Sequence, residues 1–512
     1  MYRARRLNRL RLPAARSPLH AVVPGLLAAA LVAGCAVGPD FEAPPAPAAG
    51  RYTDTPLGDT TASADTKAGE AQHFAPGRDI PAEWWTLFRS RHLTSLIEQA
   101  IAQNANLEAA QATLRQAHET ARAQAGTLLP QFDLNGSGTR QQLSPAEFGT
   151  QGGPVLFNLY NATVNVSYTF DVWGGKRRSL EASNAQADFQ RFQVEATFLT
   201  LIANVVTTAI QEASLRGQIK ATQDIIKGQT EQLEVLRGQF NLGGASRSDV
   251  LAQEAELAAT QATLPPLEKQ LEQQRSLLAT LTGKFPSEAD RQAFTLALLT
   301  LPQKLPLSLP SRLVQQRPDI RAAEEQLHQA SANIGVATAN MLPQLSITGD
   351  YGSTSLQAAQ LFTPATAVWS IGGAVAQPIF HGGTLLHQRK AAIAAFDAAR
   401  AQYRDTVLNA FRNVSDSLRA IQSDAVTLRA QERAMRTATD SLNLAREQFR
   451  VGAITYLTLL NAQRTQQQAV IGLVQAQAAR YADTAALFQA LGGGWWNRTD
   501  VPPRPPTVLA ID

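Results

Sequence analysis

A seven-residue apolar repeat is the feature of this sequence that most restricts its fold. Before the glycine at position 452, every seventh residue is apolar: Val414, Ile421, Leu428, Met435, Leu442 and Phe449. A period of 3.5 residues is typical of helices that supercoil around neighbours, whereas straight surface helices follow 3.6. Gly452 can take the left-handed backbone that ends a helix, and an apolar stripe without proline resumes from Ala453 to Leu491. The stretch Ala445–Arg464 therefore predicts the turning point of a long helical hairpin.

The same hairpin occurs earlier in the chain. Subtracting 209 from these numbers gives a second set, apolar at every position but one: Val205, Glu212, Ile219, Ile226, Leu233 and Phe240. This set leads to a second turn at Leu242–Gly243–Gly244. At 1.5 Å per residue, the helix expected over 175–240 would be about 100 Å long. That length is far too great for a compact globular domain.

Each copy is also predicted to contain two strands, one of which alternates between polar and apolar residues. In Asn161–Asp171 polar residues separate the apolar ones, which are Ala162, Val164, Val166, Tyr168 and Phe170. The predicted partner strand is Gln131–Thr139, and the second copy has its strands within 342–352 and 367–380. Tilted strands of this length cross the outer membrane in barrels, although the edge of a soluble sandwich alternates equally well.

Each copy thus contains a helix, two strands, a long helix, a turn and a return helix. A long amphipathic helix is expected from Trp84 to about Gln124, and Pro265–Pro266 is expected to break the first return helix. The predicted parts are a leader (1–34), an extended arm (35–85), the first repeat (86–300), a Pro-rich linker (301–317), the second repeat (318–495) and a disordered tail (496–512).

The leader is typical of a bacterial secretory signal. It contains six arginines and no acidic residue, and its apolar stretch Val22–Ala33 is too short to span a bilayer as a helix. Its end, LVAGC, resembles a lipobox and stops at the only cysteine of the chain. Cys35 is therefore predicted to become an acylated N-terminus anchored in outer-membrane lipid. An ordinary signal peptide beside a free thiol is the alternative.

The basic overall charge comes from this leader. The leader holds six of the 46 basic residues, so the rest of the chain carries 40 basic and 42 acidic residues, a net charge of −2. A mature chain with this charge gives no reason to expect a nucleic-acid partner.

Four strands are too few for a barrel. Single-chain bacterial barrels have at least eight strands, and an open sheet in hydrocarbon would leave unpaired backbone groups that cost several kcal/mol each. Several chains must therefore share one barrel, continued by long helices. The predicted fold class is an α+β membrane protein with a shared transmembrane β-barrel and coiled-coil helices.

Motifs along nearly the whole mature chain carry a family resemblance. They are the lipobox with CAVGPDF, AEWWTLF, QRPDIRAAEEQL (316–327), MLPQLSITGDYG, the paired GG turns and ALGGGW. In this combination the chain resembles the TolC-type outer-membrane efflux proteins, in the NodT-like lipoprotein branch that serves resistance-nodulation-division pumps. The resemblance implies a homotrimer whose twelve strands form one barrel and whose helices form a periplasmic duct.

The resemblance also implies partners and a function. A periplasmic adaptor protein would dock at the helical tips, and an inner-membrane resistance-nodulation-division pump would supply the energy. The chain itself would be the passive exit duct for small molecules such as drugs. An exit duct for protein secretion, which has the same architecture, is one alternative. A periplasmic coiled-coil tether or adaptor lipoprotein without a pore is another, and the alternating strands argue against it.

Two candidate sites follow from the resemblance. The residues that match adaptor-facing tips are Gly243, Gly244, Ser246, Gly452, Ala453 and Thr455. Leu457, Asn461 and Arg464 match positions where the family narrows its duct. Asn461 stands where an aspartate is commoner, so an acidic ring is not implied. A glycine needed only for the turn and a solvated arginine remain the simpler explanations for single residues.

No catalytic, cofactor or metal site is expected. The seven histidines lack metal-ligand spacing, and no nucleophile motif is present. The glycines at 492–494 do not form a phosphate loop, because no strand precedes them and no Lys-Ser/Thr pair follows.

Overall fold

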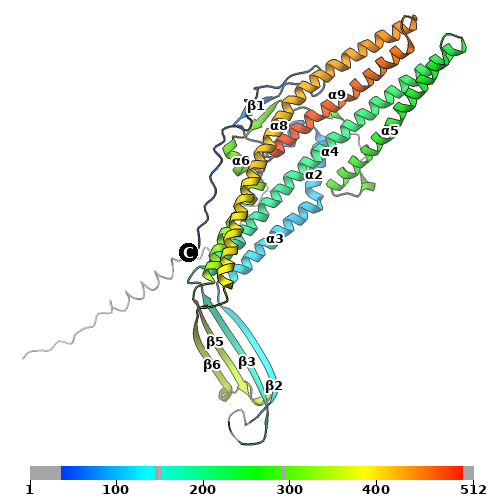
Figure 1. Ribbon diagram of the computed structural model, residues 1–512. Coiled ribbons are helices and arrows are strands. Elements are labelled where there is room, and N and C mark those ends of the chain that lie inside the picture. The colour runs from blue at the N-terminus through cyan, green and yellow to red at the C-terminus, as the bar shows by residue number, and fades with distance from the viewer. Residues whose placement is uncertain (1–35, 145–148, 150, 290–293, 500–512) are drawn as a thin grey trace, which may run out of the picture. The chain divides into compact units, whose positions relative to one another are not determined.

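The computed structural model describes residues 36–144, 149, 151–289 and 294–499. Within this part of the chain, the main helices of the two copies have identical lengths (Figure 1). They are α3 (Ala105–Gly126) and α7 (Pro318–Ala339) with 22 residues each, α4 (Gly175–Asn241) and α8 (Thr384–Arg450) with 67, and α5 (Arg247–Leu281) and α9 (Tyr456–Ala490) with 35. The predicted order of elements in each copy is confirmed.

Four strands form one antiparallel sheet. They are β2 (Gln131–Leu143), β3 (Val155–Phe170), β5 (Gln344–Ser355) and β6 (Ala367–Ala376), and their order in the sheet is β2-β3-β5-β6. The first two strands extend further than predicted, so the loop between them is shorter. The central ladder joins β3 of the first copy to β5 of the second.

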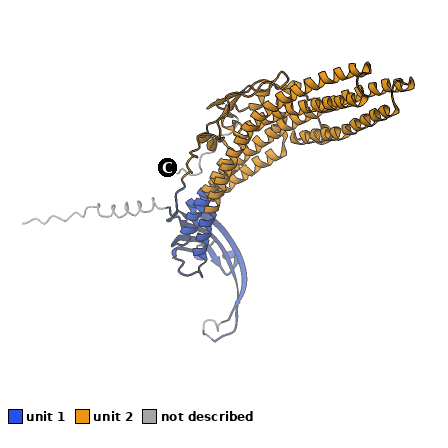
Figure 2. Cartoon of the chain, turned by 45° about the horizontal axis from the view of Figure 1, so that its top comes forward, with its two compact units in different colours: residues 1–41, 122–182, 330–396 blue, residues 42–121, 183–329, 397–512 orange. Residues whose placement is uncertain are grey.

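The chain forms two compact units that cut across both copies (Figure 2). Unit 1 (1–41, 122–182 and 330–396) contains the sheet and the helix ends next to it. Unit 2 (42–121, 183–329 and 397–512) contains the two helical hairpins and most of the N-terminal arm. Each copy therefore supplies strands to unit 1 and a hairpin to unit 2.

The predicted heptad residues form the core of unit 2. Val414, Ile421 and Leu428 are at most 1% exposed, and Leu442 is 4% exposed. Full burial of such a side chain stabilises the fold by about 1.5–3 kcal/mol. Among the described helices, only α4 contains an 18-residue window apolar enough to cross a membrane, and 61% of that window is buried inside the chain. The heptad pattern thus serves helix packing.

The arm and the linker contain structure that the sequence did not reveal. β1 (His73–Pro76) in the arm pairs in parallel with β4 (Lys304–Leu307) in the linker, which α6 (Pro310–Gln316) follows. Gln72 is fully buried, and its amide donates to Pro302 O and Thr484 Oγ1 at 3.0 Å each. The arm is therefore fastened to the helices by specific hydrogen bonds.

The predicted long first helix is wrong, because two polar residues divide it. A 3₁₀ turn (Trp84–Phe88) precedes α2 (Arg91–Gln103), whose N-terminus is capped by Ser90. Asn104 then leaves the helical conformation, and its side chain accepts from the amides of Asn106 and Leu107 at 3.0 and 3.1 Å. Asn and Ser are strong N-cap residues, so α2 and α3 begin where such caps stand. The other short 3₁₀ helices are Pro286–Glu288, Leu296–Leu298, Ala358–Gln360, Pro364–Thr366 and Trp495–Asn497.

The predicted break at Pro265–Pro266 is also wrong, since α5 continues through both residues. The two prolines leave the carbonyls of Gln261 and Ala262 without their usual donors. Both of these residues are exposed, so water can bond to their carbonyls. The helix therefore tolerates the prolines on its solvent side.

The predicted disorder of the C-terminal tail does not begin at residue 496. Trp496 Nε1 donates to Asp79 at 3.0 Å, and Arg498 forms an ion pair with Glu195 at 2.8 Å. Residues 500–512 lie outside the described part of the chain.

Candidate functional sites: an open sheet, two hairpin tips and the tie between them

One face of the sheet is apolar across all four strands. Directly opposite residues lie on the same face, and one such row is Leu134–Val164–Tyr351–Trp369. Leu134 is 80% exposed and Trp369 is 71% exposed. Large apolar side chains this exposed indicate a surface that contacts lipid or protein.

The opposite face is polar. A row across the sheet consists of Asp133, Asn165, Asp350 and Ser370. The Ser370 hydroxyl donates to Asp350 Oδ1 at 2.9 Å, and the Asn135 amide donates to Asn165 Oδ1 at 3.2 Å. One apolar and one polar face is the pattern of an outer-membrane barrel with a watery interior.

Aromatic residues mark both ends of the apolar face on β3. Tyr160 lies near the loop end of the strand and Phe170 at its helix end. The ten residue-to-residue steps from Tyr160 to Phe170 cover about 33 Å along the strand, or about 25 Å along the membrane normal at a tilt of about 40°. This matches the apolar band of transmembrane barrels, which is flanked by aromatic girdles.

Within the described residues, both edges of the sheet are open, since β2 pairs only with β3 and β6 pairs only with β5. Each edge presents a row of unpaired N–H and C=O groups, which hydrocarbon does not tolerate. The sheet of one chain is therefore part of a larger closed structure.

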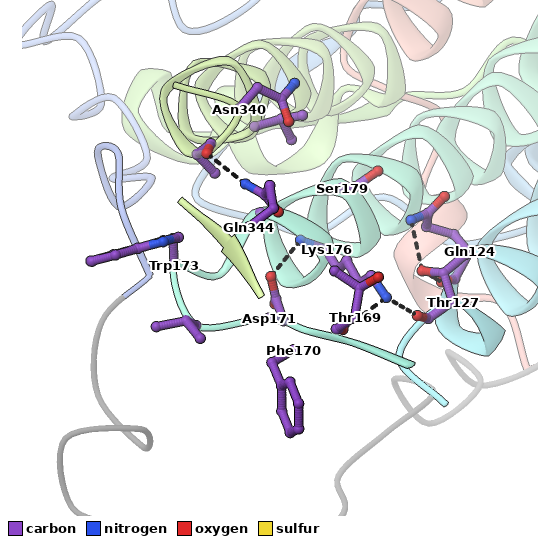
Figure 3. A pocket seen from close by; sticks show the side chains of 14 residues that line it. Gln124, Thr127, Thr169, Phe170, Asp171, Trp173, Lys176, Ser179, Asn340 and Gln344 are labelled. Atoms are coloured by element: carbon purple, nitrogen blue, oxygen red, sulfur yellow. Dashed lines mark hydrogen bonds between the residues drawn. The ribbon is translucent and has the colours of Figure 1, made fainter. Parts of the chain in front are cut away.

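A network at the end of β3 joins the sheet to α4 (Figure 3). Asp171 Oδ1 accepts from the Lys176 amide at 2.8 Å, and its Oδ2 accepts from the Arg177 amide at 2.9 Å. The Lys176 ammonium donates to Thr127 O and Thr169 O at 2.7 and 3.1 Å. A cavity of about 290 Å³ lies among these residues and the end of α7. Since Asp171 caps α4, the start of this helix is fixed relative to β3.

The two hairpin tips have the same backbone. Gly243 and Gly452 have φ values of 77° and 76°, a region that favours glycine. The next amides, Gly244 N and Ala453 N, each donate to a carbonyl five residues earlier at 2.8 Å. This pattern is a Schellman helix end, which explains the glycine at both turns.

Each tip then begins its return helix with a hydroxyl cap. The Ser246 side chain accepts from Asp249 N, and the Thr455 side chain accepts from Thr458 N. The most exposed apolar residues of the two turns are Leu242 at 90% and Val451 at 68% exposure. The repeat spacing of 209 residues relates these two positions.

Two contacts tie the second hairpin to the first near the tips. Arg464 Nε donates to Glu256 Oε2 at 2.7 Å, and the Glu256 side chain is only 8% exposed. This hydrogen bond raises the pKa of Arg464. The Tyr456 hydroxyl donates to Gln253, whose own amide donates to Gln229 O at 2.9 Å. Burial raises the pKa of Tyr456, so its hydroxyl remains a donor.

The predicted duct residues lie on one face of α9. Leu457, Asn461 and Arg464 are spaced four and three residues apart, and Leu457 is 62% exposed. The structure also identifies two residues that the sequence analysis missed, Glu256, which pairs with Arg464, and Gln253, which pairs with Tyr456. Both are polar residues buried in the apolar stripe of α5, and a polar residue at such a position could have indicated a specific contact. Cys35 lies outside the described residues.

An open, two-faced antiparallel sheet joined to long helical hairpins defines the class of outer-membrane channels with a helical extension. The model of the outer membrane efflux protein family matches residues 96–284 and 309–493, so the chain belongs to this family. The sheet and the paired hairpins confirm the predicted fold class, and the efflux function and outer-membrane location follow from the family.

Similarity to individual proteins supports this family assignment. The chain is 30% identical to the pyoverdine export outer membrane protein OpmQ of Pseudomonas putida, over 88% of this chain and 96% of that protein. It is 29% identical to the antibiotic efflux pump outer membrane protein ArpC of Pseudomonas putida, over 92% and 94%. The outer-membrane channel OprN superposes with a TM-score of 0.80 at 28% identity, over 90% of this chain and 100% of that one. The family and these relatives are efflux channels and not enzymes.

Proposed function

We propose that three copies of this chain close one outer-membrane barrel and serve as the passive exit duct of a tripartite efflux pump. The observation that carries the proposal is the four-stranded sheet with two open edges. Three such sheets supply twelve strands, enough for a closed barrel, whereas one sheet has too few. The polar face would line the duct, and the apolar face would contact lipid.

The protein partners would act at the end of the assembly that carries the helical tips. A periplasmic adaptor would dock at the tips, where Gly243, Gly244, Gly452 and Ala453 allow a close approach and Leu242 offers an exposed apolar contact. An inner-membrane resistance-nodulation-division pump would supply the energy. At the N-terminus, acylation of Cys35 would add an anchor in the outer membrane.

The narrowest part of the duct would lie near the tips, where Leu457, Asn461 and Arg464 face the interior. The ties from Arg464 to Glu256 and from Tyr456 to Gln253 hold the second hairpin against the first. Breaking them would free the second hairpin to move outward. We therefore assign them the role of closing the duct at rest.

The substrates would be small molecules. Relatives are named for the export of pyoverdine and the efflux of antibiotics, which differ widely in chemistry. Selection among them would therefore be made by the inner-membrane pump. This supports small-molecule efflux over protein secretion, the alternative with the same architecture.

Single-channel recording in a planar bilayer tests the proposal. The purified protein should give discrete conductance steps, and its removal from the cell should increase sensitivity to toxic small molecules while leaving secreted proteins unchanged. A protein that inserts and never conducts would be a tether. Loss of a secreted protein without any change in drug sensitivity would instead indicate a secretion duct.

A further inference from the structure

The cavity of about 290 Å³ at the end of β3 lies on the polar side of the sheet. Thr169 and Gln344 are among the residues that line it. Thr169 lies four residues after Asn165, and Gln344 lies six residues before Asp350. Asn165 and Asp350 belong to the polar face, and side chains alternate along a strand, so an even spacing places the lining residues on the same face. In Figure 3 the ring of Phe170, from the apolar face, points away from the other lining residues.

The helices above the sheet indicate the same side. On α4 and α7, Arg178 and Gly335 contact the N-terminal arm, because Arg178 Nε donates to Val37 O at 3.3 Å and a Cβ on Gly335 would lie 2.8 Å from that oxygen. Each residue of an α-helix adds about 100°, so Lys176 lies about 160° around α4 from Arg178. Asn340 lies about 140° around α7 from Gly335. Lys176 and Asn340 line the cavity, which therefore lies away from the arm.

Lys176 brings an unpaired positive charge to this cavity. Its ammonium donates to two backbone carbonyls at 2.7 and 3.1 Å, so one of its three N–H donors remains. The ring centroid of Tyr168 is 5.8 Å away, near the limit of about 6 Å for a cation–π contact. Within the described residues Lys176 forms no ion pair, whereas the neighbouring Asp171 pairs with Arg177 at 3.2 Å. The cavity therefore has a cation without a partner of opposite charge.

The second copy forms the equivalent junction without this charge. At the spacing of 209 residues, Lys176 corresponds to Leu385. The helices that begin there, α4 and α8, have 67 residues each. The glycines that precede them, Gly174 and Gly383, both have positive φ values, 72° and 85°. A helix of this length after such a turn thus does not require an ammonium at this position, and Lys176 is available for a ligand.

We propose that this cavity binds the anionic group, a carboxylate or a phosphate, of molecules that pass along the duct. The inference rests on the exit duct proposed above and identifies anionic small molecules as a class of substrates that pause there. Lys176 would supply the charge. The side-chain amide of Asn340, which has no hydrogen bond within the described chain, would supply a second donor. Three copies would place three ammonium groups around the duct, and rings of basic side chains favour anions in pores.

Block of the single-channel current by citrate tests this site. Citrate should interrupt the current of the wild-type protein at physiological ionic strength, where charges act over about 8 Å. Uncharged glucose should not interrupt it. Lys176→Met keeps the length of the side chain without its charge and should weaken the block about fivefold, the effect of losing a partly exposed ion pair. Lys176→Arg retains the charge and should retain the block.

The matched control is Lys390→Met. Lys390 is an exposed lysine near the start of α8 and does not line the cavity. Its substitution removes the same charge from unit 1 and should leave the block unchanged. Equal weakening by Lys176→Met and Lys390→Met, or no weakening by Lys176→Met, would overturn the site while the duct stands. A protein that never conducts would overturn the proposed function itself.

Asn340→Leu is a second variant that does not touch the carbonyls held by Lys176. Its loss of one exposed hydrogen bond should weaken the block about twofold. An unchanged block in this variant would contradict the assignment of Asn340, even where Lys176→Met fails to fold. Inorganic phosphate separates exported molecules from free ions. Citrate should block at a lower concentration than phosphate, and equal block by both would overturn the assignment of the site to substrates.

Discussion

Replacing Glu256 with Gln should open the duct at its tips. The substitution keeps the shape of the side chain and removes the charge to which Arg464 donates at 2.7 Å. Glu256 is 8% exposed and Arg464 is 51% exposed, so water screens one side of the pair. A buried hydrogen bond to a charged group contributes about 1.5–3 kcal/mol, and this half-exposed pair contributes about 1 kcal/mol per chain.

This free energy sets how far the substitution shifts the equilibrium between tied and free hairpins. A loss of about 1 kcal/mol changes the ratio of tied to free hairpins in one chain about fivefold. Losing all three ties of a trimer together amounts to about 3 kcal/mol, or roughly a hundredfold. The assay is single-channel recording of the purified protein. E256Q should spend a larger fraction of time in high-conductance states than the wild type.

The matched control is Glu254→Gln. Glu254 pairs with Arg237 at 2.8 Å within the first hairpin, so its loss removes the same charge from α5 without releasing the second hairpin. E254Q should record like the wild type. Dwell times of E256Q that cannot be distinguished from those of E254Q would refute the role of the tie.

Three further changes have defined outcomes. Cys35→Ser should abolish incorporation of labelled fatty acid; equal labelling of both proteins would remove the lipid anchor. Asn461→Asp should place three carboxylates in the narrow ring and increase cation selectivity, an increase that fades as the pH falls through the carboxylate range; unchanged reversal potentials would show that Asn461 does not line the ring. Burial and the hydrogen bond with Asp483 raise the pKa of Asp424 to about 7. Between about pH 4 and pH 7 the folded chain thus holds a proton that the unfolded chain releases, and the free energy of unfolding falls as the pH rises. Asp424→Asn should therefore lose less stability than the wild type between pH 5 and pH 8, as measured by thermal unfolding at both pH values. A pH dependence equal to that of the wild type would contradict this role of Asp424.

The periodic elements could be predicted from the sequence because burial on one face imposes a period. Val414, Ile421 and Leu428 had to be apolar to fill a helix seam, and Val164 and Val166 had to alternate with polar residues on a two-faced sheet. The 209-residue spacing then located both tips. These features follow from local geometry, which a single sequence records.

The missed features depend on contacts between distant residues or on solvent. β1 and β4 are four residues each and are strands only because they pair across about 230 positions. Pro265–Pro266 stays helical because its side of α5 faces water. The Tyr456–Gln253 contact joins residues 203 positions apart. Asn104 is different, since its N-cap signal was present and the uninterrupted apolar pattern obscured it.

The mass of the detergent-solubilised protein tests most directly that several chains share one barrel. Light scattering that separates protein from bound detergent should give three times the mass of the mature chain, with strand content retained in circular dichroism. Four strands with two open edges cannot stand alone in hydrocarbon. A monodisperse monomer with its strand content intact would contradict the account.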